Sequence, residues 1–283
     1  MRALDRDVMD AVWAAVEPLL PTRTTCPHPL GCHRRRVPDR WCFEAIVIRL
    51  VTGCSWETVE QLISYRVSDT TLRTRRDEWI AAGVFEKLIN EALSAYDRII
   101  GLDLSEVAVD GSIQKAPCGG EGTGPNPVDR GKLGWKWSIC TERNGITLGW
   151  TTDGANRQDN TLLPATLAAV AERGLLVDIE TLHLDRGYDN GIVRADCEQL
   201  GLTDVVIARK RKRRPGRNRA RVRLSLGMRW PVERTNSWFV NYGQLRRNTD
   251  RQPSHRDLEL ALAASIIITI KLITWRNRWS PIR

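Results

Sequence analysis

The pattern of apolar residues changes at residue 104, from a helical period to a series of short strands separated by helices. Short alternating or wholly apolar runs predict strands, and longer runs with a period near 3.6 predict helices. The predicted strands are residues 107–109, 135–140, 146–150, 179–184 and 205–208, and the predicted helices are 162–171, 192–200 and one that begins near Trp230. Three strands that lead into strand–helix–strand crossovers predict an α/β fold with a mixed five-stranded sheet and helices on both faces.

This order of elements is that of the RNase H-like fold, in which the first and fourth strands lie side by side. Asp110 ends the first apolar run and Asp185 ends the fourth, so we expect these two acids to be neighbours at the centre of the sheet. The helix near Trp230 would carry Glu233 to the same point. The fold would therefore bring together three carboxylates that are 75 and 48 residues apart in the sequence.

Three carboxylates in this arrangement predict a site for two Mg²⁺ ions, which Mn²⁺ could replace. Mg²⁺ prefers hard oxygen ligands and keeps several waters. Two divalent ions about 4 Å apart can activate the attacking oxygen and stabilise the leaving oxygen in a displacement at phosphorus. We expect Asp110 to bridge both ions, and Asp185 and Glu233 to complete one ion each.

Each acid taken alone has an ordinary structural alternative. An Asp before Gly is usually a turn residue, and Glu233 could form an ion pair with Arg229, four residues earlier on a helix. Of the other acids, Asp159 and Asp189 are expected to cap helices, and Asp153 is expected to lie in a turn. The prediction therefore depends on three acids that occupy three matching positions of one fold.

The positive charge of the chain is concentrated in one segment. The net charge is +9, and residues 201–250 contain 14 Lys or Arg residues against three acids, which leaves the rest of the chain close to neutral. Such a block raises the local concentration of a polyanion and predicts a nucleic-acid partner, here double-stranded DNA. The basic run 209–223 would follow DNA phosphates without reading sequence. A solvated arginine-rich loop is the alternative.

The first 100 residues are predicted to be helical. Ser55 and Ser68 are good N-cap residues for two short helices that are joined by a short turn. The pair resembles a helix-turn-helix, although many helical bundles have the same pattern. Its second helix would offer three arginines to the major groove: Arg73, Arg75 and Arg76.

Cysteine usage and hydropathy bound the cellular compartment. The seven cysteines follow no disulfide pattern and the N-terminus has no apolar signal core, so we expect a reduced, cytoplasmic protein. The most apolar stretch, residues 258–275, contains Glu259 and Lys271 and is expected to be a buried C-terminal helix, with no membrane partner. The cysteines and histidines of residues 26–33 match no standard zinc spacing.

Five motifs, in order along the chain, resemble those of the DDE transposases of bacterial insertion sequences, specifically insertion sequence families four and five. They occupy residues 108–112, 124–132, 154–159, 184–189 and 229–235. The first, fourth and fifth resemble the three acid motifs, and the other two are similar to segments of family five. Residues 38–40 and 52–56 look like the helical domain of the family. The resemblance covers most of the chain.

This resemblance implies metal-dependent DNA transposition. Water would cleave the phosphodiester at each element end, and the freed 3′-hydroxyl would then attack target DNA at the same site. It also implies recognition of terminal inverted repeats and assembly as at least a homodimer on DNA. A Tyr and a Lys that flank the third acid in family four are replaced here by Leu226 and Val240, and Arg246 or Arg247 could substitute for that Lys.

Basic and aromatic residues around the motifs are expected to contact DNA. They are Arg73, Arg75, Arg76, Arg130, Lys132, Arg186, Arg209, Lys210, Arg211, Lys212, Arg213, Arg214, Arg229, Trp230, Arg234, Arg246 and Arg247. An indole such as that of Trp230 could stack on a distorted base. Core packing is the favoured role for Trp238.

We therefore predict a helical DNA-binding domain over residues 1–100 and a catalytic domain over residues 101–283, which includes the basic run and the C-terminal helix. Two other functions remain open: a different metal-dependent nuclease on the same fold, and a catalytically silent DNA-binding relative. The sequence leaves open the end and target sequences, the cleavage route, the number of subunits and whether this copy is still active.

Overall fold

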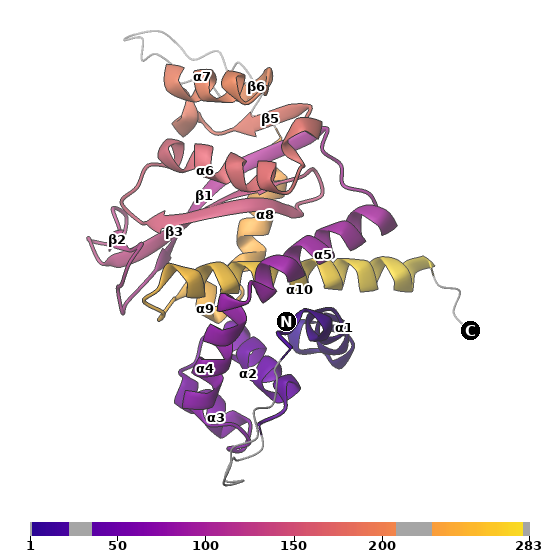
Figure 1. Ribbon diagram of the computed structural model, residues 1–283. Coiled ribbons are helices and arrows are strands. Elements are labelled where there is room, and N and C mark those ends of the chain that lie inside the picture. The colour runs from indigo at the N-terminus through magenta and orange to yellow at the C-terminus, as the bar shows by residue number, and fades with distance from the viewer. Residues whose placement is uncertain (1, 23–35, 208–227, 280–283) are drawn as a thin grey trace. The chain divides into compact units, whose positions relative to one another are not determined.

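The computed structural model describes residues 2–22, 36–207 and 228–279 of the chain. The chain forms two compact units, one of residues 1–100 with 239–283 and one of residues 101–238 (Figure 1). The basic run 209–223, Leu226 and the segment 26–33 lie outside the described residues. The DNA contacts expected of Arg209, Lys210, Arg211, Lys212, Arg213 and Arg214 lie outside them too and stay predictions.

The unit of residues 101–238 contains one mixed sheet. Its strands are β1 (Glu106–Lys115), β2 (Gly124–Pro125), β3 (Leu133–Thr141), β4 (Thr147–Gly154), β5 (Thr181–Leu184) and β6 (Asp204–Ile207). The order β4-β3-β1-β5-β6 has β1 antiparallel to β3 and parallel to β5, as the RNase H-like arrangement requires. The prediction of five strands missed β2, which pairs with β3. A strand of two residues is too short to carry a recognisable period.

Helices cover both faces of this sheet. They are α6 (Asp159–Glu172), α7 (Gly191–Gln199) and α8 (Trp230–Phe239). On β3, Ser138 accepts a hydrogen bond from Thr166 of α6, whereas the neighbouring Trp137 donates one to Asn236 of α8. Because successive residues of a strand point to opposite faces, α6 and α8 lie on opposite sides of the sheet (Figure 1). The predicted α/β fold is confirmed.

The centre of the sheet is apolar on both sides. Val107, Ala108 and Val109 of β1 are at most 2% exposed. The predicted hairpin is present between β3 and β4, and it turns at Gly145, where φ is +82°. A glycine adopts this left-handed conformation without the steric cost that a side chain would add. The hairpin and the β1–β5 pairing together place the middle of β1 and the end of β5 at the centre of the sheet.

The unit of residues 1–100 and 239–283 is helical. Its helices are α1 (Arg6–Val16), α2 (Asp39–Thr52), α3 (Trp56–Leu62), α4 (Asp69–Ala81), α5 (Val84–Ile99), α9 (Gly243–Arg246) and α10 (Pro253–Trp279). The Ser55 hydroxyl accepts a hydrogen bond from the Thr58 amide at 3.2 Å, and Ser68 does the same for Thr71 at 3.3 Å. Both predicted N-caps are confirmed.

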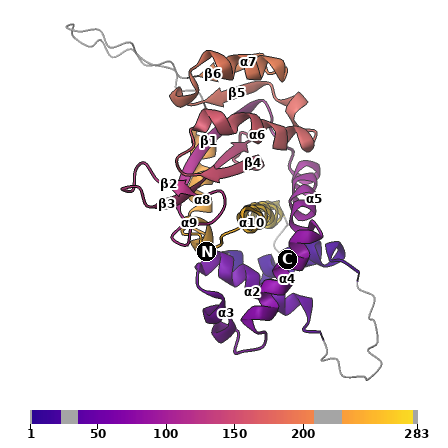
Figure 2. The same cartoon turned by 60° about the vertical axis from the view of Figure 1, so that its left-hand side comes forward.

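The C-terminal helix α10 is a core helix of this unit. It packs along α5 and α1, and Figure 2 views it nearly end-on with α5 beside it. By length and composition alone α10 could cross a membrane, but 61% of its most apolar stretch is buried within the chain. This packing assigns residues 239–283 to the helical unit, whereas the sequence had placed them in a catalytic domain of residues 101–283. A sequence pattern indicates that a helix has an apolar face, but not which unit covers it.

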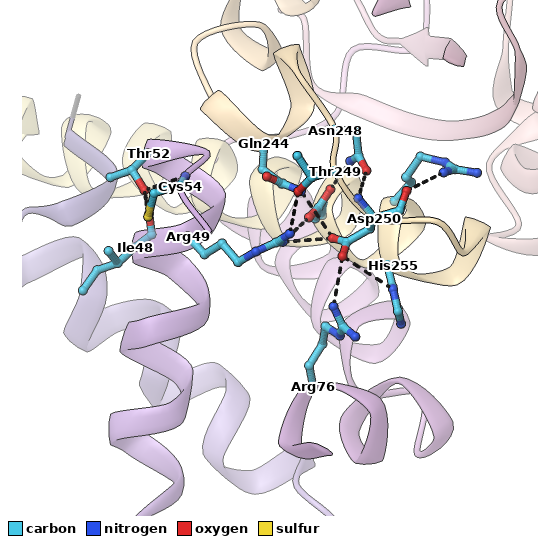
Figure 3. Close-up of polar contacts among 12 residues, drawn as sticks. Ile48, Arg49, Thr52, Cys54, Arg76, Gln244, Asn248, Thr249, Asp250 and His255 are labelled. Atoms are coloured by element: carbon cyan, nitrogen blue, oxygen red, sulfur yellow. Dashed lines mark hydrogen bonds and ion pairs between the residues drawn. The ribbon is translucent and has the colours of Figure 1, made fainter. Parts of the chain in front are cut away.

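A buried polar cluster ties α2 and α4 to the segment before α10 (Figure 3). Arg49 lies 2.9 Å from Asp250 and 3.0 Å from Glu259, and its guanidinium stacks on the Trp56 ring with 4.4 Å to the ring centroid. Arg76 adds a second ion pair to Asp250 at 3.2 Å. Buried charges are tolerated when they are paired and hydrogen-bonded in this way. The cluster therefore holds the helical unit together from the inside.

Candidate active site

Asp110 and Asp185 lie at the same point of the sheet. In the parallel β1–β5 pair, Val109 is opposite Leu184, so the two acids follow next on adjacent strands. Asp110 is part of β1, and Asp185 is the N-cap of a 3₁₀ turn whose Gly187 amide donates to its carboxylate. The predicted juxtaposition of these two acids is what the strand register produces.

Arg229 links Glu233 to Asp110 through its guanidinium. Arg229, just before α8, has its Nη2 at 3.7 Å from Asp110 Oδ1 and at 3.4 Å from Glu233 Oε1. The Glu233 side chain is 58% exposed, compared with 21% for Asp110. The ion pair between Arg229 and Glu233 is therefore present, and the same guanidinium links Glu233 to Asp110. Among the described residues, no three acidic, His or Cys side chains are close enough together to hold an ion as they stand.

Asn236 is a further contact of Asp110 that sequence reasoning missed. Its amide Nδ2 donates to Asp110 Oδ2 at 3.3 Å, and its Oδ1 accepts from the buried Trp137 indole at 2.8 Å. The indole can only donate, so it orients the amide with its NH₂ group toward the carboxylate. The available signal was its position three residues after Glu233, on the same side of the helix.

The pKa of Asp110 is raised to about 6, first by burial and then by the negative charges of Asp185 and Asp159. Arg229 and the Gly111 amide oppose this change without cancelling it. Crowded carboxylates of this kind repel one another when ionised, and a divalent cation relieves the repulsion through oxygen ligands. The oxygen-rich donor set of Asp110 and Asp185 therefore fits a hard divalent metal.

The predicted cap roles of Asp159 and Asp189 are both wrong. Gln158 is the N-cap of α6 and Asp159 is the first residue of the helix, with Oδ1 at 2.9 Å from Lys136 Nζ. Asn190 caps α7 through a hydrogen bond from the Val193 amide. Asp and Asn are both favoured at the first positions of a helix, so composition alone cannot separate the cap from its neighbour.

His183 ties the segment that leads into α8 to strand β5. Its Nδ1 accepts from the Met228 amide at 3.2 Å, and its Nε2 contacts Glu106 on β1. A backbone amide can only donate, so Nδ1 is the acceptor and Nε2 carries the proton that faces the carboxylate. This arrangement fixes the chain one residue before Arg229.

The expected DNA-contacting residues separate into exposed and buried sets. Arg75 and Arg76 are 3% and 6% exposed and are ion-paired to Asp39, Glu78, Asp77 and Asp250, so they do not face a major groove in this structure. This corrects their predicted role. The residues of the set that remain at least partly exposed are Arg73, Arg130, Lys132, Arg186, Arg229, Trp230, Arg234, Arg246 and Arg247.

Arg234 lies between two indole rings on α8. Its guanidinium is 4.4 Å from the Trp230 ring centroid and 4.8 Å from that of Trp238, and it donates to the Asn144 carbonyl. Trp230 is 52% exposed beyond this stack. Trp238 is partly buried, so its side chain contributes to packing and to the stack together. The two indoles therefore lie within two helical turns of Glu233 on the same helix.

Comparison with known proteins agrees with this geometry. Residues 102–268, more than half of the chain, match the family described as "Transposase DDE domain". The chain therefore belongs to the DDE transposases. Residues 8–89 match a second family description, "Putative transposase of IS4/5 family".

Two relatives come from Burkholderia cepacia. The "Putative transposase for insertion sequence element IS402" is 33% identical over 150 residues, which are 51% of this chain and 67% of the relative. The "Insertion element IS402 uncharacterized 16.2 kDa protein" is 31% identical over 121 residues, which are 42% of this chain and 79% of the relative. The resemblance to DDE transposases of families four and five is thus confirmed. The chain acts in the transposition of an insertion sequence, with DNA as its partner and a divalent metal as its cofactor.

Proposed function

We propose that Asp110, Asp185 and Glu233 are the catalytic carboxylates of this transposase and that they hold two Mg²⁺ ions. The observation that supports this most directly is the β1–β5 register, which makes Asp110 and Asp185 neighbours at the centre of the sheet. The raised pKa of Asp110, about 6, adds an electrostatic reason for a cation to bind there. Mn²⁺ has a similar preference for oxygen ligands and would support the same chemistry.

When bound, the two ions would activate the attacking oxygen and stabilise the leaving oxygen of the cleaved phosphodiester. Asp110 has one oxygen toward Arg229 and the other toward Asn236, so its carboxylate is held in one orientation. Arg229 offsets the repulsion between Asp110 and Glu233 in the cation-free protein. A cation bound there would replace that charge and leave the guanidinium able to bind a DNA phosphate, for which its planar fork is well suited.

Exposed basic residues around the site would position the DNA. Arg130 and Lys132 lie in the loop between β2 and β3, and Arg186 follows Asp185 directly. Phosphate contacts from such residues fix the position of a duplex but do not read its sequence. We expect the exposed Trp230, backed by Arg234, to stack on a base next to the cleaved bond.

The helical unit is proposed to bind the terminal inverted repeats. The helices α3 and α4 are joined by residues 63–68, a longer connection than the three- to four-residue turn of a typical helix-turn-helix, and Arg73 lies on the exposed side of α4. Arg246 and Arg247 are exposed at α9 in the same unit. We further propose that the protein works as a homodimer or larger assembly on DNA, because two element ends must be joined to one target.

The test is strand joining between a labelled element end and a target plasmid in the presence of Mg²⁺. Joined product is expected from the parent chain, whereas cleavage without joining would identify a nuclease of the same fold. Asp110→Ala should bind end DNA as the parent does but should neither cleave nor join. Asp153→Ala is the matched control, because Asp153 lies on β4 and pairs with the exposed Arg157. Mg²⁺-dependent cleavage by Asp110→Ala would show that the acids have been assigned wrongly.

A further inference from the structure

A second acid, Asp159, approaches Asp110 from the opposite face of the sheet. Asp159 begins α6, and its Oδ1 lies 2.9 Å from Lys136 Nζ. The Lys136 side chain is only 6% exposed and also donates to the Arg157 carbonyl at 2.8 Å. A buried ammonium requires such partners, so Lys136 holds Asp159 in one place.

Gly111 makes room for this carboxylate beside Asp110. A Cβ atom at Gly111 would lie 2.1 Å from Asp159 Oδ1, closer than any real contact. Gly111 is opposite Ser138 in the β1–β3 register, on the α6 face, whereas Asp110 is opposite Ile139 and faces α8. The Asp159 carboxylate therefore sits over the backbone of the residue that follows Asp110.

The segment 154–159 packs against glycines on three neighbouring strands. A Cβ at Gly124 of β2 would lie 1.9 Å from Asn156 Oδ1, and a Cβ at Gly134 of β3 would lie 3.0 Å from the Ala155 Cβ. A side chain at any of these three glycines, on three strands, would displace part of the segment. The glycines therefore allow the segment to pack against β1.

The charge of Asp159 acts on the groups around Asp110. Tyr188 is fully buried, and its pKa is raised well above its usual value, first by burial and then by Asp159, Asp110 and Asp185. Asp159 also contributes to the raised pKa of Asp110. Four groups, from β1, α6 and the 3₁₀ turn at residues 185–188, therefore share one electrostatic environment.

We propose that Asp159 is a positioning residue of the carboxylate site. Through its charge and its fixed position over Gly111, Asp159 strengthens divalent-cation binding at Asp110. Lys136 holds the Asp159 carboxylate in place and offsets its charge when no cation is bound. This inference rests on the proposed role of Asp110. Groups that surround metal ligands without touching the metal typically change metal affinity by about 10–100-fold.

The test is a titration of the full chain with Mn²⁺, in which the free ion is measured by electron paramagnetic resonance. Asp159→Asn is expected to weaken Mn²⁺ binding about 10–100-fold. The matched control Asp153→Asn removes the acid of β4 that precedes this segment and pairs with Arg157, and it should bind Mn²⁺ as the parent does. Parent-like affinity in Asp159→Asn would overturn the proposal.

A neutral pair separates the role of the charge from a role in folding. Asp159→Asn alone leaves the Lys136 charge buried without its carboxylate and could unfold the protein. Combining Lys136→Met with Asp159→Asn removes both charges, so this variant should melt near the parent temperature. Its Mn²⁺ affinity should lie between those of the parent and Asp159→Asn, because the lost attraction of Asp159 for the cation is partly offset by the lost repulsion of Lys136. Full recovery of affinity in the neutral pair would mean that the ion pair only supports the fold.

Gly111→Ala tests the fixed position of Asp159 independently. Its Cβ should displace the Asp159 carboxylate and weaken Mn²⁺ binding, and combining it with Asp159→Asn should add little, because both changes act through one group. Losses that multiply would contradict the proposal. Asp110→Asn serves as the reference for the site itself. If Asp110→Asn binds Mn²⁺ as the parent does, the proposed function fails, and this outcome is distinct from a failure at Asp159 alone.

Discussion

Replacing Asp110 by Asn should stabilise the metal-free protein at neutral pH. The side chain of Asp110 is 21% exposed, and its pKa is raised from 3.8 to about 6, first by burial and then by Asp185 and Asp159. Ionising this carboxyl in the folded state is therefore costly. Asn has nearly the same shape and no charge, and it can still accept a hydrogen bond from Asn236.

The size and the pH range of the effect follow from the pKa. The folded state keeps a proton that the unfolded state releases between about pH 4 and pH 6, so stability falls as pH rises through this window. A pKa that is higher by about two units corresponds to about 3 kcal/mol. Because Asn also loses the attraction of Arg229, we expect a net gain of about 1–3 kcal/mol above pH 7 and little gain at pH 4.

The assay is urea unfolding of the full chain without metal, at several pH values between 4 and 8. The parent should lose stability with rising pH over the range in which Asp110→Asn does not. Asp153→Asn provides the control, since Asp153 is paired with an exposed arginine at the surface. A parent and an Asp110→Asn variant with the same midpoint at pH 8, or a less stable variant, would refute the reasoning.

Three further predictions concern the fold and the DNA contacts. Arg49→Met should lower the free energy of unfolding by about 3–5 kcal/mol, because it leaves Asp250 and Glu259 buried without their shared cation. The control Arg6→Met should leave the urea midpoint unchanged, since the Arg6 side chain is 96% exposed, and similar midpoints for the two variants would contradict the buried cluster. Arg73→Gln should weaken salt-dependent binding of end DNA in a gel-shift assay and leave the melting temperature unchanged. Arg76→Gln should instead lower the melting temperature, and a stable Arg76→Gln protein with impaired DNA binding would show that Arg76 contacts the major groove after all. Gly145→Ala should cost about 1–3 kcal/mol in the same unfolding assay, because φ is +82° and the new Cβ would lie 2.8 Å from Thr235 Oγ1. The control Gly191→Ala has open space around it and should be neutral or stabilising, and equal effects of the two changes would show that alanine is not strained at the hairpin turn.

Local signals in the sequence predicted local structure well. Ser55 and Ser68 cap their helices as expected, because a cap requires only a side chain and an amide three residues later. The β3–β4 hairpin turns where the Asn-Gly pair indicated it would. The errors occurred where two neighbours compete for the same role, as with Gln158 and Asp159 at the start of α6.

The buried arginines show why the surface could not be read from composition. Arg73, Arg75 and Arg76 are close together in one helix, and the basic pattern alone favoured all three as DNA contacts. The structure buries Arg75 against Asp39 and Arg76 against Asp250, and residue 250 is 174 positions from Arg76. An ion pair across such a distance in sequence depends on how helices pack, which no local period encodes.

The sequence by itself determined the order of the predicted strands and helices and the position of Asp185 directly after a strand, because side-chain periods and turn residues act over a few positions. The strand end predicted at Asp110 was wrong, since β1 continues to Lys115. The sequence also determined the family, through motifs whose order along the chain is preserved. Only the tertiary structure decided that Asn236 and Arg229 hold Asp110, that Asp159 lies over Gly111, and that α10 belongs to the helical unit. These facts depend on strand register and helix packing, which bring together side chains from distant segments and set their burial and charge.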